Sequence, residues 1–137
     1  MAKIRQDREF PLAVAEWGWR FHHFGIPTTA PVPGETYIPH LKIHVAGFET
    51  SPYGAQWMRF DPDCPVHDLV RTVPHAAFVV DNLDEAIAGK TLLGEPNSPS
   101  AGLRVAMIVH GGVPIELMEF RNAEDVTREK QAIKAKI

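Results

Sequence analysis

Short apolar runs separated by turn-forming residues dominate this chain. Each run spans five to eight residues, the length of a β-strand in a globular protein, and is bounded by Pro, Gly, Ser or Asp. A Ser-Pro-Tyr-Gly turn at 51–54 predicts one hairpin, and His110-Gly111-Gly112 predicts a second. We therefore predict strands over residues 21–27, 41–48, 55–60, 76–80, 103–109 and 113–120.

Helical signals are few and short. Asn82 stands three residues before Glu85 and ahead of an apolar triplet, and Gly89 follows, which predicts a capped helix between them. One or two helical turns are expected within residues 10–19. We predict a polar connector over residues 61–71 and a loop with at most a weak strand over residues 94–102. Residues 122–137 form a charged tail whose sequence is compatible with a helix.

The two halves of the chain share a weak internal sequence similarity. His23 and His75 each open an apolar strand, and Gln56 and Glu116 each precede a Met and a Phe at the same spacing. Each half thus carries one ligand-type side chain on its first strand and another on its last. A chain built from two similar units can place its functional site between them.

Strand periodicity shows what these four residues have in common. Because alternate residues of a strand share a face, Glu116 points the same way as Met118, and His75 the same way as Ala77. A carboxylate on such an apolar face needs a strong partner, and a divalent cation is one of the few. Nitrogen and oxygen donors of this kind suit Ni, Co, Zn, Mn or Fe, with positions left open for water or substrate.

Three segments resemble the vicinal oxygen chelate superfamily, which includes glyoxalase I, methylmalonyl-CoA epimerase, extradiol dioxygenases and bleomycin-resistance proteins. PHAAFVVDNLDEAIAGK and GLRVAMIVHGGVPIELMEF resemble its second module, and FHHFGIPT resembles the first strand of its first module. The resemblance implies an α+β fold in which two βαβββ modules curl a sheet around a metal cleft.

The implied organisation is a single domain over residues 1–137, with an N-terminal arm at 1–20, module one at about 21–62, module two at about 74–120 and a tail at 121–137. The first module departs from the family pattern, because the prolines and glycine of TAPVPGETYIP break any helix between Pro27 and His40.

The resemblance also implies a ligand set. The family's first-strand histidine matches His23, the histidine opening the second module matches His75, and the closing glutamate matches Glu116; the remaining position falls on Gln56. These four would hold one divalent ion (Ni, Co, Zn, Mn or Fe), with Glu116 doubling as the catalytic base. The implied reaction is a glyoxalase- or epimerase-like proton transfer on a small substrate with vicinal oxygens, with stabilisation of an enolate.

Other interpretations of these residues stay open. An Fe(II) ring-cleaving dioxygenase needs only two histidines and one carboxylate, and a metal-free pocket of the bleomycin-resistance kind needs none. His23 and His75 could simply bond backbone carbonyls, and Glu116 could pair with Arg59 or Arg104.

Three more histidines compete as metal ligands. They are His22, His40 and His44. The last two would stand about 13 Å apart along an extended strand, too far to chelate one ion side by side.

Composition and net charge limit the classes of partner that this protein is expected to bind. Fourteen Lys and Arg against seventeen Asp and Glu give a net charge of −3, so neither nucleic acid nor an anionic membrane is an expected partner. Cys64 is the single cysteine, which leaves no internal disulfide and suits a reducing compartment. With no apolar run long enough to cross a bilayer and no signal-peptide pattern, we expect a cytoplasmic protein. By analogy with the family, we expect a homodimer that binds a small molecule.

Overall fold

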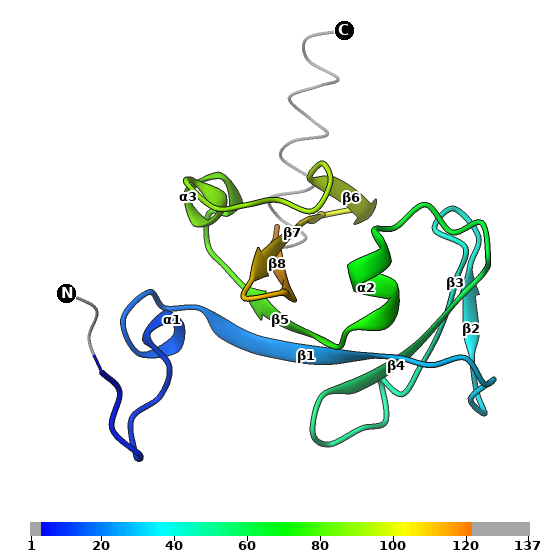
Figure 1. Ribbon diagram of the computed structural model, residues 1–137, viewed down its shortest axis with the longest axis horizontal. Helices are drawn as coiled ribbons and strands as arrows, with labels where there is room; N and C mark the ends of the chain where they lie inside the picture. Colours follow the sequence, from blue (N-terminus) through cyan, green and yellow to red (C-terminus); the bar gives the residue numbers. More distant parts are fainter. Residues whose placement is uncertain (1–3, 122–137) are drawn as a thin grey trace, which may run out of the picture.

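The computed structural model describes residues 4–121, and the predicted tail at 122–137 lies outside them. These residues form one eight-stranded sheet with three short helices, an α+β arrangement as predicted. Viewed along the molecule's shortest axis, the sheet curls into a U (Figure 1). None of the helices in the described part of the chain is long and apolar enough to span a membrane.

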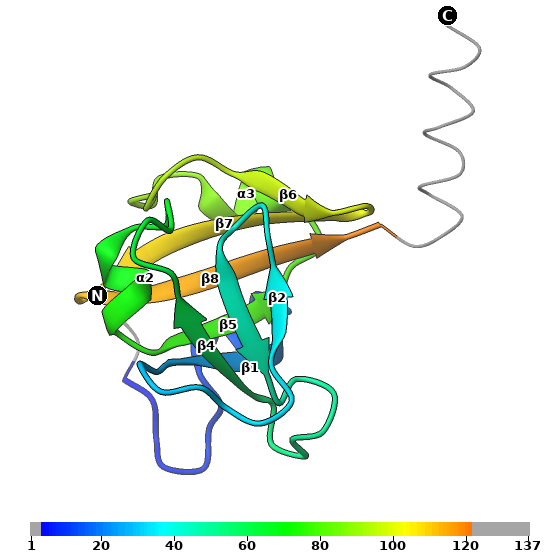
Figure 2. The same cartoon turned by 90° about the vertical axis from the view of Figure 1, so that its right-hand side faces the viewer.

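The strands are β1 (Arg20–Pro27), β2 (Thr36–Ile38), β3 (Ile43–Ala46), β4 (Ala55–Phe60), β5 (His75–Val79), β6 (Asn97–Ser100), β7 (Leu103–His110) and β8 (Val113–Phe120). Their order across the sheet is β2-β3-β4-β1-β5-β8-β7-β6. Each half contributes one arm of the U, and the first strands of the two halves, β1 and β5, pair antiparallel at its base (Figures 1 and 2). The two arms are therefore joined where the site strands lie.

Both predicted hairpins form. β3 pairs antiparallel with β4, although the first of these strands is limited to four residues. β7 and β8 pair along all eight residues, joined by Gly111 and Gly112 with φ of 56° and 80°. Positive φ at both central positions is what a tight hairpin turn requires and what glycine allows.

The helices occupy different sides of the sheet. α3 (Leu83–Ile87) begins where the Asn82 side chain accepts a hydrogen bond from the Glu85 N–H at 3.0 Å, as the capping pattern predicts. It packs on β7 and β8 from outside the U, whereas α2 (Asp68–Thr72) lies between the two arms and contacts β1 and β8 (Figure 1). α1 (Leu12–Ala15) is one helical turn in the N-terminal arm, where one or two turns were expected.

Two features differ from the sequence predictions, and a third agrees with them. The connector at 61–71 contains α2, because His67 caps it by accepting a hydrogen bond from the Leu69 N–H. An unpredicted strand, β2, pairs with β3 at the edge of the sheet. Between β1 and β2 there is no helix, as the prolines predict, so the first module is an all-strand unit.

The apolar core lies between α3 and the outer face of the second arm. It is formed by Val80, Leu83, Ala106, Ile108 and Leu117. Leu117 has no exposed surface and faces α3, so its neighbour Glu116 must face the inside of the U. Core packing on one side of β8 thus fixes the direction of the candidate site residue on the other.

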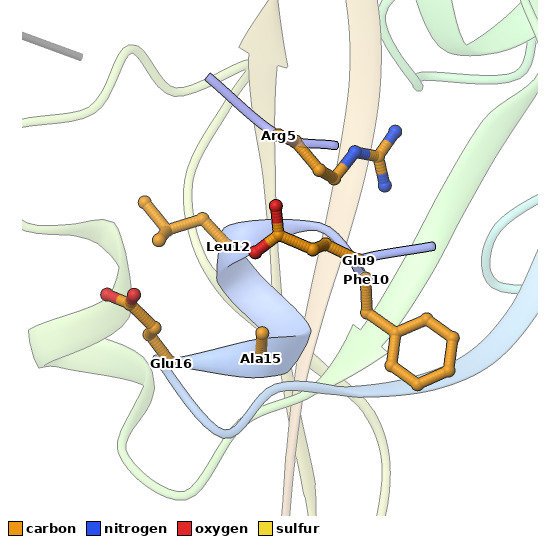
Figure 3. A pocket seen from close by; sticks show the side chains of 6 residues that line it. All are labelled: Arg5, Glu9, Phe10, Leu12, Ala15 and Glu16. Carbon is orange, nitrogen blue, oxygen red and sulfur yellow. The ribbon is translucent and has the colours of Figure 1, made fainter. Parts of the chain in front are cut away.

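The N-terminal arm carries a shallow surface pocket of its own. Its walls come only from Arg5, Glu9, Phe10, Leu12, Ala15 and Glu16 (Figure 3). None of these belongs to the residues predicted to bind a metal.

Candidate metal centre

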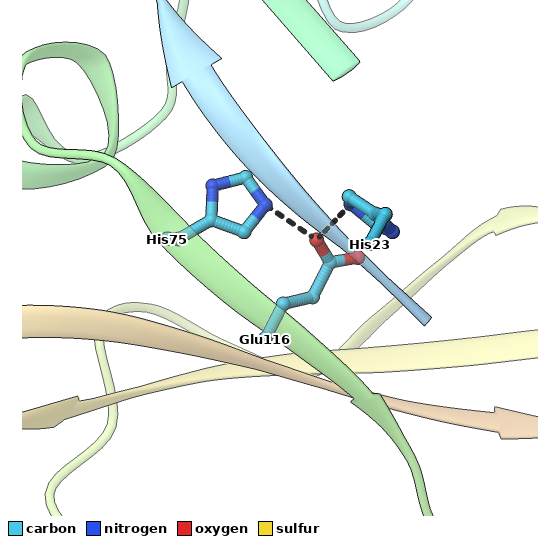
Figure 4. A group of neighbouring side chains, drawn as sticks. All are labelled: His23, His75 and Glu116. Carbon is cyan, nitrogen blue, oxygen red and sulfur yellow. Dashed lines mark ion pairs between the residues drawn. The ribbon is translucent and has the colours of Figure 1, made fainter. Parts of the chain in front are cut away.

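Three adjacent strands bring three of the predicted ligands together. His23 lies on β1, His75 on β5 and Glu116 on β8, and one donor atom from each falls within 4.8 Å of the others (Figure 4). His75 Nε2 is 3.0 Å from Glu116 Oε1, and His23 Nε2 is 3.6 Å from the same oxygen. Among the described residues, no other group of His, Cys, Asp and Glu meets this spacing.

Sheet register explains why these side chains converge. Ala77 is paired with His23 on one side and with Glu116 on the other, so all three share a face. Gly25 is paired with His75 by the same ladder. The candidate ligands thus alternate across neighbouring strands with glycine and alanine, the two smallest residues, and the fully buried Ala77 leaves space between the flanking donor atoms.

The absence of a side chain at Gly25 makes room for His75. A Cβ built on Gly25 would lie 2.1 Å from Cε1 of the His75 ring and 2.7 Å from Nε2. The imidazole therefore lies across the β1 backbone at a point where any other residue would displace it. Gly25 was part of the motif that carried the family resemblance, but nothing in the sequence indicated that its role is to seat a ring from another strand.

The site is buried, and its ring nitrogens are not all satisfied. His23 and His75 are 4% and 2% exposed, and the Glu116 side chain is 17% exposed. Despite the short distance to Glu116, the geometry at His75 is not that of a hydrogen bond, and neither of its ring nitrogens has a hydrogen-bond partner. Buried polar atoms are nearly always bonded, so these nitrogens indicate a group that would complete the site.

Electrostatics keep Glu116 ionised. Burial by itself would raise the pKa of this carboxyl, but the neighbouring His23 and His75 imidazoles outweigh it and lower the pKa to about 2. A metal ligand must be deprotonated, and this carboxylate is so throughout the neutral range. The predicted alternative, a pair with an arginine, is wrong, because Arg59 pairs with Glu35 and Arg104 with Asp84 and Glu119.

Gln56 lies on the same face as the three candidate ligands. β4 pairs parallel with β1 and places Gln56 opposite Gly25. Gln56 is therefore one strand farther from Glu116 than His23 is. Its side chain thus starts from the correct face of the sheet for a fourth ligand. Direct coordination by Gln56 stays a prediction.

The competing histidines have other roles. His22 Nδ1 is 2.8 Å from His23 Nδ1, so it contacts a candidate ligand instead of joining the group. Burial, and then the adjacent His23, lower the pKa of His22, while Glu116 opposes them. His40 is exposed in a turn.

His44 belongs to a separate polar network on the opposite face of the first arm. Its Nε2 is 2.9 Å from Asp61 Oδ1, and Tyr37 donates a hydrogen bond to the other oxygen of the same carboxylate at 2.7 Å. Arg59 donates two hydrogen bonds to Glu35 and, with the Val32 N–H, lowers the pKa of Glu35 to about 2. These groups satisfy one another's hydrogen-bonding capacity, so we interpret the network as structural.

Comparison with known proteins supports the fold. No family model and no curated protein matches the sequence. Among solved structures, the chain resembles a hypothetical protein, BH1468, from Bacillus halodurans C-125, with a TM-score of 0.56 and 19% identity over 76% of this chain and 96% of that one. It also resembles methylmalonyl-CoA epimerase from Mycobacterium tuberculosis, with a TM-score of 0.53 and 22% identity over 75% of this chain and 89% of the epimerase. At these identities, the likeness shows a shared architecture.

Proposed function

We propose that the protein is a metal-dependent enzyme of the glyoxalase and epimerase type, which moves a proton on a small substrate with two neighbouring oxygens. The observation that carries this proposal is the convergence of two buried imidazoles and one carboxylate on the concave face of the sheet. The epimerase architecture of a structural neighbour is consistent with it.

The residues present fit a divalent cation. His75 offers ring nitrogens that no described residue satisfies, His23 directs Nε2 to the same point, and Glu116 supplies the negative charge. Two nitrogens and a carboxylate oxygen suit Ni, Co, Zn, Mn or Fe, and Gln56 would be the fourth ligand. When bound, such an ion would act as a Lewis acid toward neighbouring substrate oxygens.

Glu116 is the proposed proton carrier. The eight strands contain only two acidic residues, Glu116 and Glu119, and the second faces outward, where it accepts a hydrogen bond from the Leu83 N–H at 2.8 Å. Glu116 is therefore the strand carboxylate that reaches the concave face. Its ionised state leaves it able to accept a proton from a carbon acid held beside it.

The same two glutamates give a matched test. We would load the protein with Co²⁺, Ni²⁺, Zn²⁺ or Mn²⁺, measure binding by calorimetry, and follow exchange of carbon-bound hydrogen for deuterium in a panel of small hydroxyketones and thioesters by NMR. We expect exchange with the native protein and with Glu119→Gln, and none with Glu116→Gln. Exchange by Glu116→Gln at the native rate, or a native protein that binds none of these ions, would refute the proposal.

A ring-cleaving Fe(II) dioxygenase is the second candidate, because two histidines and one carboxylate are the ligand set of that enzyme class. Anaerobic loading with Fe²⁺, followed by a catechol and oxygen, tests it. A yellow ring-cleavage product would favour the dioxygenase over proton transfer. If the native protein neither binds any of these ions nor is thermally stabilised by them, the result would instead favour the function of a metal-free binding protein.

A further inference from the structure

We propose that His22 is a positioning residue for the metal centre, which holds His23 in the one tautomer able to bind a cation through Nε2. This inference rests on the proposed metal centre. The two rings meet through their Nδ1 atoms at 2.8 Å, and the far nitrogen of His23 faces Glu116.

The direction of this hydrogen bond decides what His23 can do. A neutral imidazole carries one N–H, and its other nitrogen is an acceptor. If His23 donates from Nδ1, its Nε2 keeps a free lone pair for a cation bound beside Glu116 Oε1, which is 3.6 Å away; without the cation, the ionised carboxylate favours a proton on Nε2 instead. If His22 donates instead, the proton of a neutral His23 sits on Nε2 and blocks coordination. A His22 ring that accepts at Nδ1 therefore prepares His23 as a ligand, as outer partners of metal-binding histidines generally do.

A β-bulge creates this contact. Neighbouring residues in a regular strand point to opposite faces, so two consecutive histidines would normally be separated by the backbone. The register between β1 and β5 shifts between Phe21 and His23, which makes His22 the extra residue. The shift brings the two rings to a centroid distance of 5.0 Å. Bulges are known to redirect side chains next to functional sites in this way.

Two aromatic rings from outside β1 flank the His22 ring. Phe48, just after β3, is stacked on it at 5.2 Å with an interplanar angle of 25°, and Phe120, at the end of β8, lies at 5.6 Å and 35°. Their contacts restrict the plane of the imidazole and so the direction of Nδ1. His22 is thus positioned by both arms of the U while it contacts a ligand on the strand between them.

The first test is the tautomer of His23 in the native full-length chain loaded with Zn²⁺, read from ¹⁵N chemical shifts and two-bond couplings at a pH where both rings are neutral. We expect the proton of His23 on Nδ1. A proton on Nε2 would overturn the inference without any variant, and it would leave the proposed metal centre to be judged by metal binding alone.

The second test compares variants. His22→Phe keeps a flat ring but removes the acceptor, whereas His22→Gln offers a carboxamide oxygen in its place. We expect His22→Phe to shift His23 toward the Nε2–H tautomer and to weaken Zn²⁺ or Co²⁺ binding by about 10- to 100-fold. Partial recovery of both is expected in His22→Gln. His40→Phe, at an exposed turn, is the control and should match the native protein.

These outcomes separate the two proposals. Native affinity and an unchanged tautomer in His22→Phe would overturn the role of His22 while leaving the metal centre intact. Failure of the native protein to bind any ion would overturn the metal centre, and the positioning role with it.

Discussion

Replacing Gly25 with alanine tests the packing that holds the site together. The new Cβ would lie 2.1 Å from Cε1 of His75, whereas ordinary contacts begin at 3.4 Å, so the ring must retreat by about 1.3 Å. Alanine by itself would favour the strand by roughly 0.5–1 kcal/mol over glycine. Overpacking a buried position costs about 1–3 kcal/mol, which exceeds that gain. We therefore expect a net loss of stability in Gly25→Ala.

The effect on metal binding should be larger than the effect on folding. Metal–ligand distances tolerate about 0.2 Å, so a displacement of about 1.3 Å removes His75 from the ligand set and should weaken binding at least tenfold. The assay pairs calorimetric titration with Zn²⁺ or Co²⁺ with denaturant unfolding of the metal-free protein. Ala106→Val, which adds volume to the buried outer face, is the control: it should lose stability and keep metal affinity. Gly25→Ala with native affinity would refute the proposed role of this glycine.

Three further predictions address other parts of the chain. Ala77→Val places a larger side chain between the two outer ligands, so metal affinity should fall at least tenfold; unchanged affinity in a titration would contradict the register argument. Asn82→Ala removes the cap of α3 and should cost about 1 kcal/mol in urea unfolding, with metal affinity unchanged; a change in affinity would show that α3 acts on the site. The pKa of Glu35, held at about 2 by Arg59 and below its ordinary value near 4.5, makes its stabilisation present above pH 4.5 and lost as the pH falls toward 2. Acid titration of unfolding should therefore show Glu35→Gln less stable than the native protein at neutral pH, with a difference that shrinks below pH 4.5 and disappears below pH 2, and parallel curves would refute this.

Local sequence patterns predicted much of the observed fold. Short apolar runs between turn residues located the site strands, the two-glycine turn predicted the pairing of β7 with β8, and Asn82 capped α3 as its spacing predicts. The direction of Glu116 also followed from periodicity, because a strand with Leu117 in the core must turn its neighbour the other way.

Other features depended on contacts between distant segments. β2 is three residues long and exists because it pairs with β3, so no local pattern marks it. α2 depends on a histidine cap in a stretch that the sequence predicts only as a polar connector. The pairing of His22 with His23 needs a bulge, which a single sequence does not display as a spacing.

A crystal structure of the protein grown with Co²⁺ or Zn²⁺, with anomalous data collected at the metal edge, tests the central claim most directly. We predict one anomalous peak at roughly 2.0–2.2 Å from Nε2 of His23, Nε2 of His75 and a carboxylate oxygen of Glu116. A peak at the His44 and Asp61 network instead, or no peak between the three strands, would contradict it.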